Sequence, residues 1–214
     1  MEVNPPFEVV EQVLSATSAI CPVVQVFLIP VSVARKLLGG EQLDKPDVDF
    51  TAIQVKLNEI SKNIQELLQH IEFKEARDSY VEYVKCINYQ YNTLMEVVKT
   101  GQNMSKFKEA YENANREKGL FVLYEGVKGK DVVFFKPLLK LYQEHYKNDY
   151  EKMRNYCSDL WQLFCMGFTT VMVYTAIDND DLNQAHNKWC SRMEEIAEEM
   201  TKVLDECKKK KSQE

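Results

Sequence analysis

The longest stretch without proline or glycine constrains this chain more than any other feature. Neither residue occurs between Pro46 and Gly101, so nothing in this span is a strong helix breaker. Apolar residues recur there at alternating steps of four and three, as in the seam of a helix that packs against a partner. We therefore predict one long, heptad-patterned helix over residues 48–100, about 50 residues and roughly 75 Å in length.

The seam of this predicted helix changes register once, near residues 73–77. The first half consists of Ile53, Leu57, Ile60, Ile64, Leu67 and Ile71. The second half consists of Tyr80, Val84, Ile87, Tyr91, Leu94 and Val98. Such a seam must be covered, either by later helices of the same chain or by a second copy.

The remaining segments also favour helices. The chain has only 7 Gly and 6 Pro in 214 residues, which favours helices joined by short turns. Residues 1–45 are interpreted as apolar N-terminal helices, and residues 101–214 as further helices with a glycine-containing loop near 124–131. Pro137 suits the first turn of a helix over residues 138–147. The prediction is a single all-α domain over residues 1–214, an elongated helical bundle built around the long helix.

Two further helices are expected near the C-terminus. One covers residues 149–177, and the acidic turn at residues 178–181 can cap the next, which runs from about 182 to 208. The apolar face of that last helix contains Met193, Ile196, Met200, Val203 and Cys207.

Charge and composition exclude several classes of function. The formal net charge is −6, the opposite of the Lys/Arg excess that a nucleic-acid surface needs. The lysine run at residues 208–211 fits a helix C-terminus, with membrane contact or localisation as the alternatives. The N-terminus lacks the basic start and apolar stretch of a secretory signal, so we expect a cytoplasmic protein. The 6 cysteines would then be reduced thiols, and their scattered spacing predicts no metal site.

No catalytic, cofactor-binding or metal-binding residues can be assigned from the sequence. The segment that starts at Gly126 lacks the glycine spacing and the hydroxyl of a phosphate loop. His70, His145 and His186 match no ligand or base–nucleophile spacing. We therefore expect no enzyme, no cofactor and no small-molecule substrate.

Clustered tyrosines are interpreted as contacts between helices, with their hydroxyls at the edge of the core. A partner-binding face is the alternative. The residues concerned are Tyr80, Tyr83, Tyr89, Tyr91, Tyr142, Tyr146, Tyr150 and Tyr156.

Two uncharged stretches are long enough to cross a bilayer, namely residues 13–34 and 160–177. The favoured interpretation of the second is a central helix buried on all sides. A third possibility combines the buried helix with the membrane span, because a soluble bundle can shelter an apolar hairpin and release it into a membrane.

Several short motifs spread over the chain resemble those of the rapunzel family of fish proteins. The most specific is Tyr124-Glu125-Gly126-Val127-x-Gly129-Lys130. The others are Phe50-x-x-Ile53-x-x-Lys56-Leu57-x-Glu59-Ile60-Ser61, Pro137-Leu138-Leu139 with Tyr142, Cys157 ahead of an apolar helix, Tyr174-Thr175-Ala176, and Trp189 ahead of Met193. The resemblance extends from about residue 9 to residue 207. More distantly, the chain is similar to the helical region of cephalotoxin-like proteins.

The resemblance implies a role in fin and skeletal development and supplies no catalytic residues. The leading hypothesis is thus a non-enzymatic helical protein that binds an unknown protein partner or itself through the exposed faces of its helices. The alternative is a membrane-active, pore-forming-like protein that inserts residues 13–34 or 160–177.

Overall fold

The computed structural model describes residues 50–69, 74–100, 104–129, 137–178 and 180–211. The predicted N-terminal helices and the apolar segment 13–34 lie outside the described residues. Within the described ranges the chain forms seven α-helices and no strand. They are α3 (Phe50–Leu68), α4 (Lys74–Thr100), α5 (Met104–Asn113), α6 (Lys118–Lys128), α7 (Leu138–His145), α8 (Tyr150–Asp178) and α9 (Leu182–Lys211).

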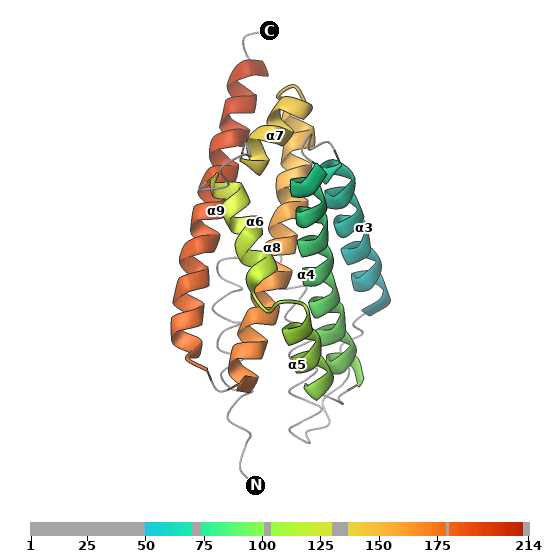
Figure 1. Cartoon of the computed structure of the whole chain (residues 1–214). Coiled ribbons are helices and arrows are strands. Elements are labelled where there is room, and N and C mark those ends of the chain that lie inside the picture. Colours follow the sequence, from blue (N-terminus) through green and yellow to red (C-terminus); the bar gives the residue numbers. More distant parts are fainter. Residues whose placement is uncertain (1–49, 70–73, 101–103, 130–136, 179, 212–214) are drawn as a thin grey trace, which may run out of the picture.

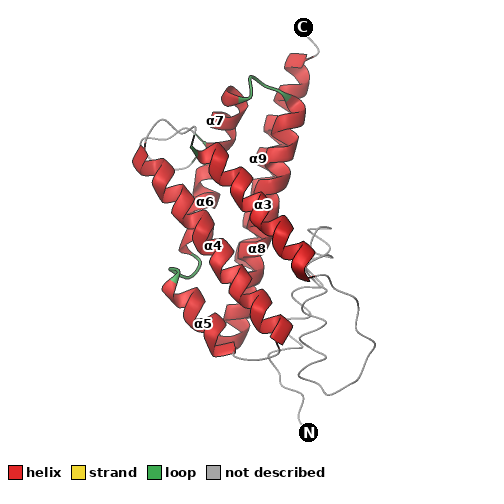
Figure 2. Ribbon diagram, turned by 90° about the vertical axis from the view of Figure 1, so that its right-hand side faces the viewer, coloured by secondary structure: helices red, strands yellow, loops and turns green. Residues whose placement is uncertain are grey.

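The helices form an elongated all-α bundle, as predicted, but the bundle is built around α8 and not around a long helix over residues 48–100 (Figure 1). Helix α8 contacts α9 on one side and α3 and α4 on the other. Helix α6 bridges α4 and α9 across a third face, and α7 packs against α9. Helices α3 and α4 lie side by side on the face that Figure 2 turns toward the viewer. The bundle therefore has one central helix, and the helix that contains the long uncharged stretch 160–177 occupies that place.

The prediction of one long helix over residues 48–100 is wrong. The span forms two helices of 19 and 27 residues that run antiparallel and pack against each other. The register change at residues 73–77 is the physical reason, because a helix that reverses can turn both halves of the seam toward the same core. Ile60 and Ile64 of the first half are buried, as are Tyr80, Val84, Ile87, Tyr91 and Leu94 of the second.

Helix α8 is long and apolar enough to cross a membrane by length and composition, yet 83% of its most apolar window is buried in the bundle. The buried threonine hydroxyls of α8 form hydrogen bonds with carbonyl groups of the preceding helical turn. The hydroxyls of Thr169 and Thr175 donate to the carbonyls of Cys165 and Val171, each at 2.8 Å. Such bonds lower the cost of burying a hydroxyl. In the bundle, α8 is the buried central helix that the sequence favoured.

Two predicted helix ends are confirmed and one loop is corrected. The backbone N–H of Gln184 donates to the Asp181 carboxylate at 3.0 Å, so the acidic turn caps α9. Pro137 directly precedes α7. The glycine-containing loop near residues 124–131 begins later than predicted, because α6 continues through Gly126 to Lys128. Gly129 then ends the helix with φ 64°, a left-handed conformation that suits glycine.

Candidate functional site

An aromatic and charged cluster joins α6 to α9. Trp189 is fully buried, and its indole N–H donates to a Glu117 carboxylate oxygen at 2.9 Å. The other Glu117 oxygen accepts from the Lys188 ammonium at 2.8 Å. Glu117 precedes α6, whereas Lys188 and Trp189 belong to α9. One carboxylate thus ties the start of α6 to the first half of α9.

Arg192 lies among three aromatic rings in the same cluster. Its guanidinium carbon is 4.7 Å from the ring centre of Trp189, 4.8 Å from that of Phe121 and 5.1 Å from that of Tyr124. A cation over an aromatic face gains electrostatic attraction, and more when water is excluded. The Nη1 atom of Arg192 is buried without a hydrogen-bond partner, so the rings are its main surroundings on that side.

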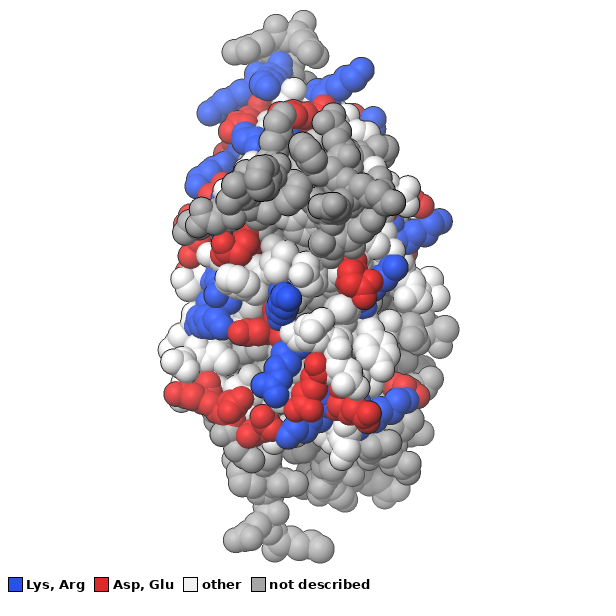
Figure 3. Space-filling view, in the orientation of Figure 1, with Lys and Arg blue, Asp and Glu red and all other residues white. Residues whose placement is uncertain are grey.

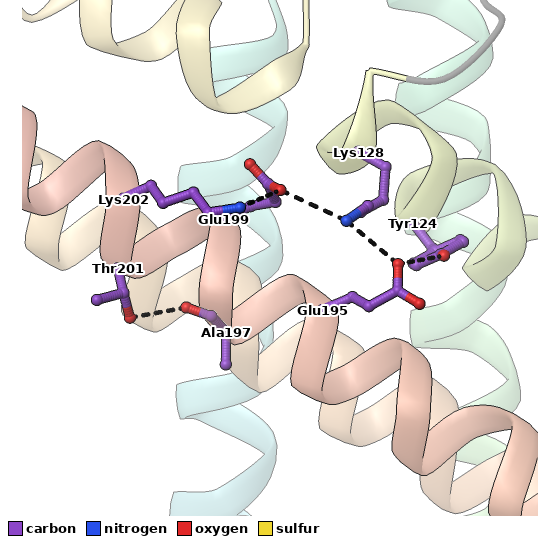
Figure 4. A network of polar contacts seen from close by, with 7 residues as sticks. All are labelled: Tyr124, Lys128, Glu195, Ala197, Glu199, Thr201 and Lys202. Carbon is purple, nitrogen blue, oxygen red and sulfur yellow. Dashed lines mark hydrogen bonds and ion pairs between the residues drawn. The ribbon is translucent and has the colours of Figure 1, made fainter.

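Further along α9, Lys128 of α6 lies between two glutamates (Figure 4). Its ammonium is 3.2 Å from Glu195 and 3.4 Å from Glu199. The Tyr124 hydroxyl donates to the same Glu195 oxygen at 2.9 Å. Lys202 contacts Glu199 from the solvent side at 3.0 Å. The end of α6 is therefore fastened to α9 by an ion-pair network.

A third polar contact joins α7 to α9. The Lys140 ammonium and the Gln143 amide both donate to the same oxygen of Glu206. These hydrogen bonds lower the pKa of Glu206.

The pKa values of Glu117 and Glu199 are also below the usual range. Burial works to raise the pKa of Glu117, but hydrogen bonds from Lys188 and Trp189 lower it. Burial works likewise on Glu199, where hydrogen bonds from Lys202 and Lys128 lower the pKa. Three carboxylates along α9 and α6 are thus held in the ionised form.

We expect the bundle to lose stability in acid because these pKa values are lowered. Lowered carboxyl pKa values contribute stability that is present above the unfolded-state pKa, about 4.3, and is lost as the pH falls through the folded-state values. Each contact is partly exposed, so its share is at most about 1 kcal/mol. Urea unfolding at pH 7, 4 and 3 measures the loss. In the variant Glu206→Gln the decline should be shallower; an unchanged slope would contradict the assignment.

The motif over residues 124–130, which resembles the rapunzel family, has a structural explanation at the end of α6. A Cβ atom at Gly126 would lie 2.6 Å from the Tyr80 hydroxyl oxygen and 3.0 Å from a methyl of Leu138. Gly126 therefore allows α6 to approach α4 and α7 closely. Together with the Tyr124 hydroxyl bond to Glu195 and the left-handed Gly129, this explains three residues of the motif, Tyr124, Gly126 and Gly129, through packing and backbone conformation.

The clustered tyrosines include one pair whose hydroxyls differ from the prediction. Tyr142 and Tyr156 pack with ring centres 3.9 Å apart, and both hydroxyl oxygens are buried. Burial raises the pKa of both phenols well above the usual value. The interpretation as contacts between helices fits these two residues, but their hydroxyls lie inside the core and not at its edge.

Cysteine and histidine side chains form no evident reactive centre in the described ranges. The Cys190 sulfur lies 3.3 Å from a ring nitrogen of His186, one helical turn away. Burial and the nearby Glu194 raise the pKa of Cys190, so the thiol is not activated as a nucleophile. His145 is exposed and His70 lies outside the described residues. No group of three or more metal-ligating side chains occurs among the residues that the structure describes.

A groove lies between α3 and α4, on the face seen in Figure 2. It encloses about 570 Å³ and is open to solvent on one side. We call it the amide groove, since side-chain amides dominate its walls. The lining residues are Asn58, Ser61, Lys62, Gln65, Glu66, Gln69, Lys85, Asn88, Tyr89 and Asn92.

Sequence reasoning identified neither surface. The signal for the α6–α9 cluster is the spacing of Trp189, Arg192 and Glu195, which puts them on one helix face. The signal for the amide groove is the repeated Asn and Gln on the faces of α3 and α4 that are not apolar. Both patterns are ordinary for exposed helix surfaces, so only the packing distinguishes them.

Fold and surface together define the class: an all-α bundle with a buried apolar helix at its centre and charged contacts that fasten its outer helices. The chain belongs to the rapunzel family and contains a cephalotoxin-like middle helical domain, whose family model matches residues 41–214. It is 31% identical over 209 residues to Protein rapunzel from Danio rerio, covering 94% of this chain and 92% of that protein. No solved structure matches the chain. The resemblance found in the sequence is thereby confirmed.

Proposed function

We propose that this chain is a non-enzymatic protein that acts through protein–protein contacts of its helices. Membership of the rapunzel family supports a role in fin and skeletal development. We further propose that the protein acts in the cytosol, with membrane association as the alternative. The observation that carries the proposal is the surface around Phe121, formed by Phe121, Arg192, Glu117 and Lys188. Aromatic residues and arginine dominate the binding energy of protein interfaces.

The Phe121 surface has the structure of an interface centre with a charged rim. Phe121 is 38% exposed although it is a large apolar side chain. The Arg192 guanidinium packs on its ring at 4.8 Å and restricts it. An ordered anchor loses less rotamer entropy on binding, which favours association. Glu117 and Lys188, both partly exposed, form an ion pair beside it and supply polar contacts.

The variant Phe121→Ala should lose partner capture without unfolding. Truncating a central aromatic anchor costs roughly 2 kcal/mol or more of binding free energy, about thirtyfold in affinity. Quantitative pull-down with tagged full-length protein measures the loss, and circular dichroism checks the fold.

Val55→Ala is the matched control, since Val55 is an exposed apolar residue on α3. It should capture partners as the wild type does. Loss of capture in Val55→Ala alone would move the contact to α3 and would overturn the assignment to the Phe121 surface. Light scattering of the purified protein distinguishes a foreign partner from self-association.

Membrane activity is the second candidate function, and the length and apolar character of α8 favour it. Insertion would require α8 to leave the core, because most of its apolar window is buried. Cell fractionation with a carbonate wash separates the two proposals. Release supports a soluble or peripheral protein, and retention supports insertion.

A further inference from the structure

We propose that the amide groove between α3 and α4 binds a neutral, hydroxyl-rich ligand, namely the pyranose ring of a carbohydrate. The shared chemistry is that of sugar hydroxyls, whether they belong to a free saccharide, a glycan on a protein or the headgroup of a glycolipid. This site is separate from the Phe121 surface, so the proposal does not depend on the protein-contact function.

The walls of the groove offer paired donors and acceptors. Each Asn or Gln amide has an N–H₂ that donates and an oxygen that accepts, which matches the dual character of a hydroxyl. Amides stand on both helices, and together they surround the hollow. They are Asn58 and Gln65 on α3, Gln69 in the turn directly after α3, and Asn88 and Asn92 on α4.

A fixed polar centre lies at the base of the groove. The buried Ser61 hydroxyl oxygen accepts from the amides of Gln65, at 2.9 Å, and Asn88. These bonds orient two of the amides before any ligand arrives. The Oδ1 atom of Asn92 is buried without a hydrogen-bond partner. A buried acceptor of this kind is costly unless a donor meets it. A sugar hydroxyl would meet it once the Asn92 amide turned toward the groove, because the oxygen has no accessible surface in the observed position.

The ring of Tyr89 provides the apolar contact that a saccharide needs. It lines the groove and is 56% exposed. The C–H face of a pyranose is apolar and packs on an aromatic ring, while its edge presents hydroxyls to the amides. An exposed aromatic ring beside an array of amides fits that amphipathic shape.

The same walls disfavour the other ligand classes. A docking helix needs apolar surface to bury, and among the described lining residues Tyr89 is the one aromatic or large aliphatic side chain. A phosphate or carboxylate needs a cationic cradle, but Lys62 pairs with Glu66 at 3.6 Å. Among the described lining residues Lys85 is the other cation, so two cations share the lining with one carboxylate and form no cradle around one point. A neutral polar ligand fits best.

The test titrates the isotope-labelled full chain with lactose, maltose and diacetylchitobiose, followed by amide chemical shifts. Saturable shifts of the groove amides with at least one of these sugars are expected. Asn92→Leu and Tyr89→Ala should each weaken the affinity about tenfold, the loss for one hydrogen bond or one ring contact. Val55→Ala, an exposed position on α3, is the control and should bind as the wild type does.

A second arm uses phosphatidylcholine vesicles with and without lactosylceramide. Binding only to the glycolipid vesicles, lost in Asn92→Leu, assigns the groove to a lipid headgroup. Binding of the soluble sugars alone assigns it to a free or protein-borne glycan. The proposal fails if no sugar shifts the groove amides saturably, or if both variants bind as tightly as the wild type while thermal melting shows them folded.

Discussion

Ile64→Asp should destabilise the protein by about 3–5 kcal/mol, the cost of an uncompensated charge in a buried site. Ile64 is 1% exposed and belongs to the seam of α3 that packs toward α4 and α8. A carboxylate there would lose its hydration in an apolar surrounding. Because a domain is only marginally stable, a loss of this size removes much of its free energy of unfolding. Urea unfolding followed by circular dichroism measures the change.

Val55→Asp is the matched control for this prediction. Val55 lies on the same helix but is 62% exposed, so the same carboxylate should change the stability by no more than about 0.5 kcal/mol. Equal stability of the two variants would mean that α3 does not pack on the bundle in solution. The seam, and the antiparallel pairing of α3 with α4, would then be wrong.

The apolar periodicity predicted most of the helices, because apolar residues must recur at helical spacing wherever one face of a helix is buried in the core. The periodicity does not determine where a helix ends. The predicted face of the last helix, which includes Met193, Ile196 and Met200, is buried in α9. The same pattern could not show that residues 48–100 reverse direction, because a straight helix and a helical hairpin present the same seams. Proline and glycine, the usual breakers, are absent from that span. The change of register was the one signal, and it was compatible with both arrangements.

Gly126 shows a different limit of sequence reasoning. A glycine in a polar segment usually indicates a turn. In this bundle Gly126 lies inside α6, and the close approach of Tyr80 explains why the position holds a residue without a Cβ atom. Whether a glycine serves conformation or close packing depends on its neighbours in space, and Tyr80 is distant in sequence. The cluster around Arg192 was hidden for the same reason, since its rings come from α6 as well as α9.

Trp189→Ala should cost about 3–5 kcal/mol of unfolding free energy, because it deletes a fully buried indole and leaves a cavity between α9 and its neighbours. Arg192 would also lose one of its three aromatic faces, and Glu117 would lose a hydrogen bond. Urea unfolding measures the total loss of unfolding free energy.

Trp189→Phe separates the packing contribution from the hydrogen-bond contribution, since it keeps an aromatic ring but removes the N–H donor. It should cost about 1–2 kcal/mol. If Trp189→Phe were as damaging as Trp189→Ala, the hydrogen bond to Glu117 and not the packing would hold α9 to the start of α6. If both variants melted as the wild type does, α9 would not be seated on the bundle through this residue, and the Phe121 surface that depends on the neighbouring Arg192 would lose its support.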